Sequence, residues 1–108
     1  MSYEKFNELE SLAGDYAKAE ADRLYLAEFR KTKKALLMKE YESKHPGAAI
    51  SAQEREAYAH PEYLEVIEGL KEATEKALKI KFDMEVVKIK FETWRTKQAT
   101  IRAEMNLQ

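Results

Sequence analysis

The sequence predicts an all-α protein that folds as a long antiparallel helical hairpin, coiled-coil-like and assembling into an oligomer. Apolar residues recur every three or four positions along most of its 108 residues. Charged residues make up 36% of the chain and there are only three glycines and two prolines, a composition typical of long solvated helices. At this length we expect one domain, residues 1–108. Its expected parts are a helix over about 3–44, a connector with a short helix over about 45–60, and a helix over about 61–105.

The first long helix is predicted from apolar residues at helical spacing. Gly14 lies inside this pattern and costs up to about 1 kcal/mol relative to alanine, so we expect fraying or a kink there. The apolar positions are Phe6, Leu9, Leu12, Ala13, Tyr16, Ala17, Ala19, Leu24, Leu26, Phe29, Leu36, Leu37 and Met38.

Two breaks bound the connector. The first is His45-Pro46-Gly47, because proline disfavours helical dihedrals at the preceding residue and glycine frees the turn. Ser51 and Glu54 then form an S-x-x-E capping box, which predicts a short helix to about Ala59. Pro61 suits the first turn of the next helix. A connector this short favours an antiparallel arrangement of the two long helices.

The second long helix carries an unbroken seven-residue repeat, here called the heptad row. A strict 3.5-residue period favours winding around a partner helix. One member, Gln98, is polar, and a buried polar residue in such a row often sets register or oligomeric state. The row comprises Tyr63, Val66, Leu70, Ala73, Ala77, Ile80, Met84, Val87, Phe91, Trp94, Gln98, Ile101 and Met105.

A second apolar row lies nearly opposite the heptad row on the same helix. This opposite row is Leu78, Phe82, Val86 and Ile89. A helix that is apolar on two sides needs more than one neighbour, and a second copy of the chain is the simplest candidate. The alternative is a monomeric three-helix bundle in which the connector helix covers this row. The expected self-association residues are Leu70, Ala77, Leu78, Ile80, Phe82, Met84, Val86, Val87, Ile89, Phe91, Trp94 and Ile101.

The residue inventory argues against an enzyme. There is no cysteine, and the only two histidines, His45 and His60, adjoin prolines without any metal-ligand spacing. No glycine-rich loop is present to hold a phosphate, so we expect no cofactor and no metal. The chain shows no signal peptide and no membrane-spanning stretch. We therefore expect a cytoplasmic protein.

The first long helix carries a basic cluster. Six cations fall within 17 residues, although the whole chain has a net charge of −1. Such a surface can follow a phosphate backbone, and nearby aromatic rings can stack on bases. The alternative is a solvated charged face with the aromatic residues in the core. The expected nucleic-acid-binding residues are Arg23, Tyr25, Phe29, Arg30, Lys31, Lys33, Lys34 and Lys39.

A further basic and aromatic stretch, residues 88–97, lies near the C-terminal end. Its aromatic residues, Phe91 and Trp94, already belong to the heptad row, so we assign them to packing.

Two stretches carry a resemblance to a known family. Residues 33–41, Lys-Lys-Ala-Leu-Leu-Met-Lys-Glu-Tyr, are followed by the Pro46-Gly47 turn and resemble the N-terminal region of phage recombination mediators of the UvsY type. Residues 94–105 are similar to the closing helix of small phage proteins encoded beside recombination genes. The family's basic motif carries an arginine where this chain has Leu-Leu-Met. The DNA-binding role that the resemblance implies therefore applies to Lys33, Lys34 and Lys39. The resemblance implies a helical oligomer that binds single-stranded DNA and helps a recombinase displace single-strand binding protein.

Three functions follow as hypotheses. The first is a non-enzymatic, oligomeric recombination mediator that binds single-stranded DNA and helps load a recombinase. The second is a phage-type protein-interaction module that inhibits or modulates a host enzyme or defence complex without binding nucleic acid. The third is a structural coiled-coil component of a larger particle.

Overall fold

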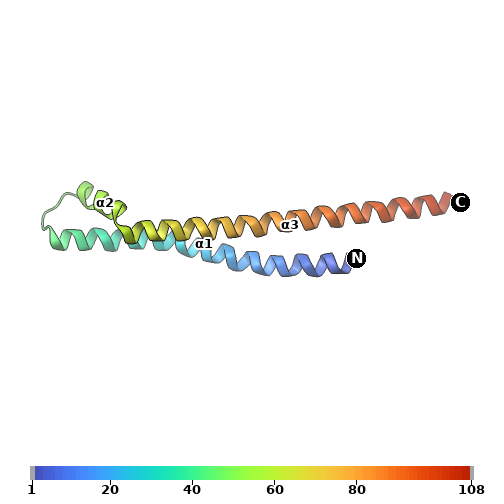
Figure 1. Ribbon diagram of the computed structural model, residues 1–108, viewed down its shortest axis with the longest axis horizontal. Coiled ribbons are helices and arrows are strands. Elements are labelled where there is room, and N and C mark those ends of the chain that lie inside the picture. The colour runs from blue at the N-terminus through green and yellow to red at the C-terminus, as the bar shows by residue number, and fades with distance from the viewer. Residues whose placement is uncertain (1, 108) are drawn as a thin grey trace. The chain divides into compact units, whose positions relative to one another are not determined.

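The computed structural model describes residues 2–107 and confirms the all-α hairpin of two long helices and a short connector helix (Figure 1). Helix α1 spans Ser2–Lys44, α2 spans Ile50–Ala59 and α3 spans Pro61–Leu107. All regular structure within residues 2–107 is helical. Gly14 does not interrupt α1, because the packing of a helix this long outweighs the propensity cost of one glycine.

Contacts divide the chain into two compact units. Residues 19–76 form what we call the turn unit, which contains both breaks and all of α2. Residues 2–18 and 77–107 form the terminal unit. Each unit combines a segment of α1 with a segment of α3. The expectation of a single domain stays a prediction.

The first break lies where the sequence places it. Helix α1 ends at Lys44, and Gly47 adopts a φ of +82°, a left-handed conformation that glycine tolerates best. The Ala48 amide donates to the His45 carbonyl at 3.1 Å, which closes the turn. The His45 ring stacks on Tyr41 with 4.3 Å between ring centroids. His45 is therefore a turn residue.

The predicted capping box is wrong. Helix α2 begins at Ile50 with Ala49 as its N-cap, and no side chain caps it. Ser51 consequently already lies inside the helix. Gln53 ties the helix start to the turn instead: its side-chain amide donates to the Ala48 carbonyl at 3.0 Å, and the residue is buried. The motif failed because the helix starts one residue before the serine.

His60 caps the start of α3. Its ring Nδ1 accepts a hydrogen bond from the Glu62 amide at 3.0 Å, and its carbonyl accepts from Tyr63 and Leu64 at 3.0 and 3.1 Å. Pro61 is the first helical residue, as predicted. The His60 side chain thus satisfies one of the amides that a helix start leaves unpaired.

The core of the turn unit draws one residue from each helix. Leu37 of α1, Ala57 of α2 and Tyr63 of α3 are buried together, and Met38 and Ile67 pack against them. Because Ala57 is small, α2 can approach the two long helices closely. This cluster fixes α2 against the hairpin.

Replacing Leu37 with alanine is expected to lower the free energy of unfolding by about 2–5 kcal/mol, because a buried leucine leaves a cavity when truncated. Its neighbour Leu36 offers a matched control, since it is 55% exposed against 4% for Leu37. The same change there is expected to shift stability by no more than about 0.5 kcal/mol. Urea unfolding followed by circular dichroism measures both, and equal effects would contradict the assigned core.

In the terminal unit the heptad row of α3 faces α1 over most of its length. Val87 is buried, and the side chains of Ile80, Met84, Phe91, Trp94 and Gln98 are half-buried. Ile101 and Met105 are exposed, so the burial of the row ends after Gln98. On α1 the facing positions are half-buried and spaced four, three and four residues apart: Lys5, Leu9, Leu12 and Tyr16.

Several residues of the apolar pattern that predicted α1 are exposed. Phe6 is 60% exposed and Leu24 is 52% exposed, and Leu36, Ala13 and Ala17 also lie outside. The half-buried line contains Lys5, and one residue rotates a position by about 100° around a helix. Phe6 therefore lies off the contact line.

The opposite row is uncovered. Leu78, Phe82, Val86 and Ile89 are 44%, 57%, 48% and 65% exposed. Helix α2 packs within the turn unit, against Leu37 and Tyr63. The alternative in which the connector helix covers the opposite row is therefore wrong.

Candidate nucleic-acid interface

The basic cluster lies partly along the line where α1 meets α3. Arg23, Arg30 and Lys33 share this half-buried line with Leu26 and the buried Leu37, at alternating spacings of three and four residues. The expected solvated face is thus only part of the arrangement. Long aliphatic stems allow arginine and lysine to pack along such a line while their charged ends reach water.

Four of the six cations have an acidic partner. Two pairs lie within α1, where Glu20 binds Arg23 and Glu28 binds Lys31. The other two connect helices: Lys33 Nζ lies 3.1 Å from a Glu62 oxygen on α3, and Lys34 Nζ lies 3.8 Å from a Glu54 oxygen on α2. Among the described residues, Arg30 and Lys39 form no ion pair.

The Lys33–Glu62 pair joins α1 to the first turn of α3. The Lys33 ammonium holds the pKa of the Glu62 carboxyl below its usual value, first by its hydrogen bond and then by its charge. The negative carboxylate also lies near the positive end of the α3 dipole. The main contact of Lys33 is therefore this ion pair between α1 and α3.

A groove of about 430 Å³ gathers three of the predicted cations. Its cationic lining is Arg30, Lys31 and Lys34, all from α1. Two aromatic rings, Tyr58 of α2 and Tyr63 of α3, complete it, and its apolar lining is Ala35 and Met38. We call this the basic–aromatic groove.

Lys34 and Tyr58 are coupled within the groove. The Lys34 Nζ lies 4.6 Å from the Tyr58 ring centroid, within the range of a cation–π contact. The Tyr58 side chain raises the pKa of the Lys34 ammonium, desolvation opposes that shift, and Glu54 adds to it. Tyr58 is 46% exposed, and its ring meets Tyr63 edge-on at 5.3 Å. The charged Lys34 amine therefore lies over a ring that remains about half exposed.

Tyr25 and Phe29 do not belong to the groove lining. Their rings stack on each other with 6.0 Å between centroids and 10° between planes. Tyr25 is exposed and lines a different hollow, together with Asp22, Glu72 and Lys76. Two carboxylates there disfavour a phosphate. The structure thus separates the predicted stacking residues from most of the predicted cations.

No family model, no curated protein and no solved structure matches this chain. Across residues 2–107, no three histidine or acidic side chains come together as a metal site would require. No helix in that range combines the length and apolarity needed to cross a membrane.

Sequence reasoning missed Tyr58 and Tyr63 as site residues. Tyr63 was assigned to the heptad row, and its burial is consistent with that role. Tyr58 precedes the His60-Pro61 break by two residues. The sequence signal that could have indicated them was a pair of tyrosines, one on each side of a helix break. The sequence alone does not show which helix they face.

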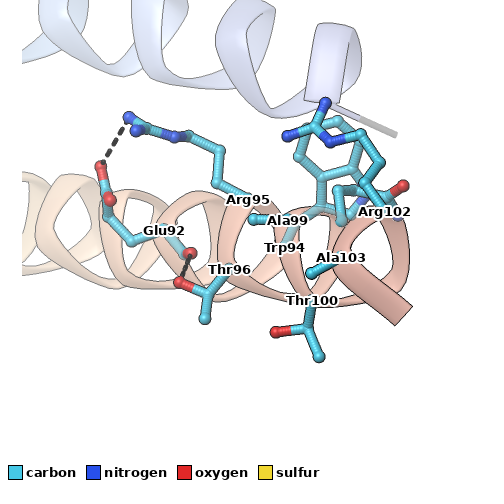
Figure 2. A pocket seen from close by; sticks show the side chains of 9 residues that line it. Glu92, Trp94, Arg95, Thr96, Ala99, Thr100, Arg102 and Ala103 are labelled. Atoms are coloured by element: carbon cyan, nitrogen blue, oxygen red, sulfur yellow. Dashed lines mark hydrogen bonds and ion pairs between the residues drawn. The ribbon is translucent and has the colours of Figure 1, made fainter. Parts of the chain in front are cut away.

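A second basic surface lies on α3 in the terminal unit. Lys81, Lys88, Arg95 and Arg102 follow one another at seven-residue intervals, and all are exposed. Arg95 and Arg102 project to the same side near Trp94, beside a hollow of about 600 Å³ (Figure 2). Within residues 2–107, these four side chains, which we call the α3 stripe, form one ion pair, a 3.8 Å contact from Arg95 to Glu92.

Phe91 and Trp94 lie with ring centroids 6.3 Å apart and are half-buried, which agrees with packing as their main role. The α3 stripe therefore offers cations with little exposed ring surface. This distinguishes it from the basic–aromatic groove.

Proposed function

We propose that this protein is a non-enzymatic, oligomeric recombination mediator that binds single-stranded DNA in the basic–aromatic groove and helps load a recombinase. One observation carries the DNA-binding part: Arg30, Lys31 and Lys34 converge beside the accessible ring of Tyr58. Cations beside an aromatic face are the combination that single strands select, because phosphates and unpaired bases are bound together.

The groove favours a single strand over a duplex. An aromatic ring can stack only on a base that is not already stacked on both sides. The net charge of −1 gives no long-range attraction to duplex DNA, so binding depends on this local arrangement. Arg30 contributes most directly, since no acidic side chain in the described chain neutralises it.

The mediator role rests on the resemblance of residues 33–41 to UvsY-type proteins and of residues 94–105 to small phage proteins encoded beside recombination genes. The proposed partners are single-stranded DNA, a recombinase or single-strand binding protein, and further copies of the chain. The exposed opposite row supports the last of these, and repeated copies would present several grooves to one strand. Such a protein would act in the cytoplasm where phage DNA recombines.

Titration of a labelled single-stranded oligonucleotide at low salt tests the proposal. We expect binding that weakens steeply as salt rises, because each phosphate contact releases counterions. Changing Arg30 and Lys34 to glutamine together is expected to reduce the slope of log affinity against log salt by about 1.4, at about 0.7 per lost contact.

The matched control is Lys88→Gln with Arg95→Gln, which removes two cations from the α3 stripe. We expect it to leave both affinity and slope nearly unchanged. A larger loss in this control than in the groove variant would move the DNA site to α3. No binding by the wild-type protein below about 10 μM at low salt would end the DNA proposal.

One observation favours the second candidate, a protein-interaction module without nucleic acid. Lys33 and Lys34 are engaged by Glu62 and Glu54 from two other helices, as a purely structural role would require. In that case the variant with Arg30 and Lys34 changed to glutamine would keep the oligomeric state and the cellular phenotype of the wild type.

A further inference from the structure

The opposite row continues into a seven-residue repeat on the exposed face of α3. Phe82, Val86, Ile89 and Thr93 follow at spacings of four, three and four, and all four are exposed. Thr93 donates its hydroxyl proton to the Ile89 carbonyl at 2.9 Å, so its side chain presents mainly its methyl group. A hollow beside Ile89 and Thr93 also runs along this face. The pattern is that of a helix prepared to pack against another helix.

Charges of opposite sign flank the segment from Val86 to Thr93. At 100° per residue, Glu85 and Glu92 fall on one edge, and Lys90 and Lys97 fall on the other. Asp83 precedes them on the lysine edge, where it pairs with Lys79 of the same helix at 3.0 Å. Among the described residues, Glu85, Lys90 and Lys97 form no ion pair within the chain, and Glu92 has only the 3.8 Å contact with Arg95. Four charges are therefore available to a neighbouring helix.

We propose that this face binds the same face of a second copy, with the two α3 helices parallel and in register. In a parallel pair, a residue on one edge meets the residue five positions later on the other edge of its partner. Glu85 then meets Lys90 of the second copy, and Glu92 meets Lys97 of the second copy. The two-fold symmetry repeats both contacts, so four opposite-charge pairs flank the apolar row.

An antiparallel pair would bring glutamates together on one edge, and on the other edge it would bring Lys90 near Asp83, which already pairs with Lys79 within α3. In that arrangement each edge faces the same edge of its partner. With Val86 opposite Ile89 of the second copy, Glu85 approaches Glu92. With Val86 opposite Phe82 of the second copy, Glu85 approaches Glu85 of the second copy. Exposed pairs add little stability, so their effect is to select the orientation while the apolar row supplies the binding energy.

This inference deepens the self-association that the proposed function includes, and it holds without any DNA. In a parallel pair the two copies of α3 point the same way along the contact. Failure of DNA binding would leave it untouched, and its own failure would leave the groove intact.

Oxidative cross-linking tests the orientation directly, because the chain contains no cysteine. In the parallel pair Thr93 lies beside Thr93 of the second copy. Thr93→Cys is therefore expected to form a disulfide-linked dimer under mild oxidation. In the antiparallel pairing with Val86 opposite Ile89, Thr93 lies opposite Phe82 of the second copy. The two Thr93 residues are then about 16 Å apart along the helix axis. A disulfide spans only about 4.4–6.8 Å between Cα atoms.

Thr32→Cys, an exposed threonine on α1 in the turn unit, measures linkage by random collision. We expect Thr93→Cys to link at least tenfold faster than this control. Equal rates in a protein that sediments as a dimer would overturn the parallel orientation. Sedimentation as a monomer at 100 μM would overturn the whole interface. Circular dichroism of both variants confirms that the helices remain formed.

Discussion

Replacing Tyr58 with alanine is expected to weaken single-stranded DNA binding by roughly 5- to 150-fold. The range follows from about 1–3 kcal/mol for each base stacked on an aromatic ring, at about 1.4 kcal/mol per factor of ten. Tyr58 is accessible and lies 4.6 Å from the Lys34 ammonium, so a base on this ring would place its phosphate near a cation. Fluorescence anisotropy at one fixed salt concentration measures the loss.

Two further variants make this prediction specific. Tyr58→Phe keeps the ring and removes the hydroxyl, and it is expected to bind within about threefold of the wild type if stacking dominates. Tyr25→Ala removes a similarly accessible ring outside the groove and is expected to have little effect. If Tyr25→Ala weakens binding and Tyr58→Ala does not, the strand follows the α1 surface instead of the groove.

Changing Phe82 to glutamate is expected to weaken self-association by at least about 100-fold. Phe82 is the largest side chain of the opposite row and lies near its middle, where truncation of a buried aromatic anchor commonly costs at least about 2 kcal/mol. The substitution also places a charge inside the contact, which adds a desolvation penalty. Sedimentation equilibrium over a concentration series measures the change.

Leu24→Glu is the matched control, because Leu24 is similarly exposed but belongs to α1. It is expected to leave the oligomeric state unchanged. If this variant dissociates the assembly and Phe82→Glu does not, self-association uses α1. DNA binding by the dissociated Phe82→Glu protein would show whether one groove suffices.

The helical hairpin could be predicted because its signals are local and repeated. Both breaks depend on proline and glycine, whose backbone preferences act at the residue itself. The heptad row is apolar at nearly every position, so its period is visible without knowledge of the partner. The same reasoning failed on α1, where Arg23, Arg30 and Lys33 occupy the contact line. Their charges concealed the packing of their aliphatic stems.

The candidate site was predicted only in part, for a different reason. Arg30, Lys31 and Lys34 share one helix, so spacing alone groups them. Tyr58 reaches them from another helix, and its place depends on how Ala57 seats α2 against the core. The capping box also placed the N-cap of α2 at Ser51, two residues after the observed Ala49, because the turn is tied by Gln53 and not by Ser51. Local motifs do not contain such long-range contacts.

In the groove, the Glu54 carboxylate competes with any anionic ligand for the Lys34 ammonium. A carboxylate from the same molecule occupies the neighbourhood of the ammonium before any ligand arrives. A small lone anion must displace it for a single contact, whereas a strand gains several contacts at once. If the groove binds single strands as proposed, it would discriminate by the length of the ligand as well as by its charge. Glu54 would then re-form its contact with Lys34 as the strand leaves.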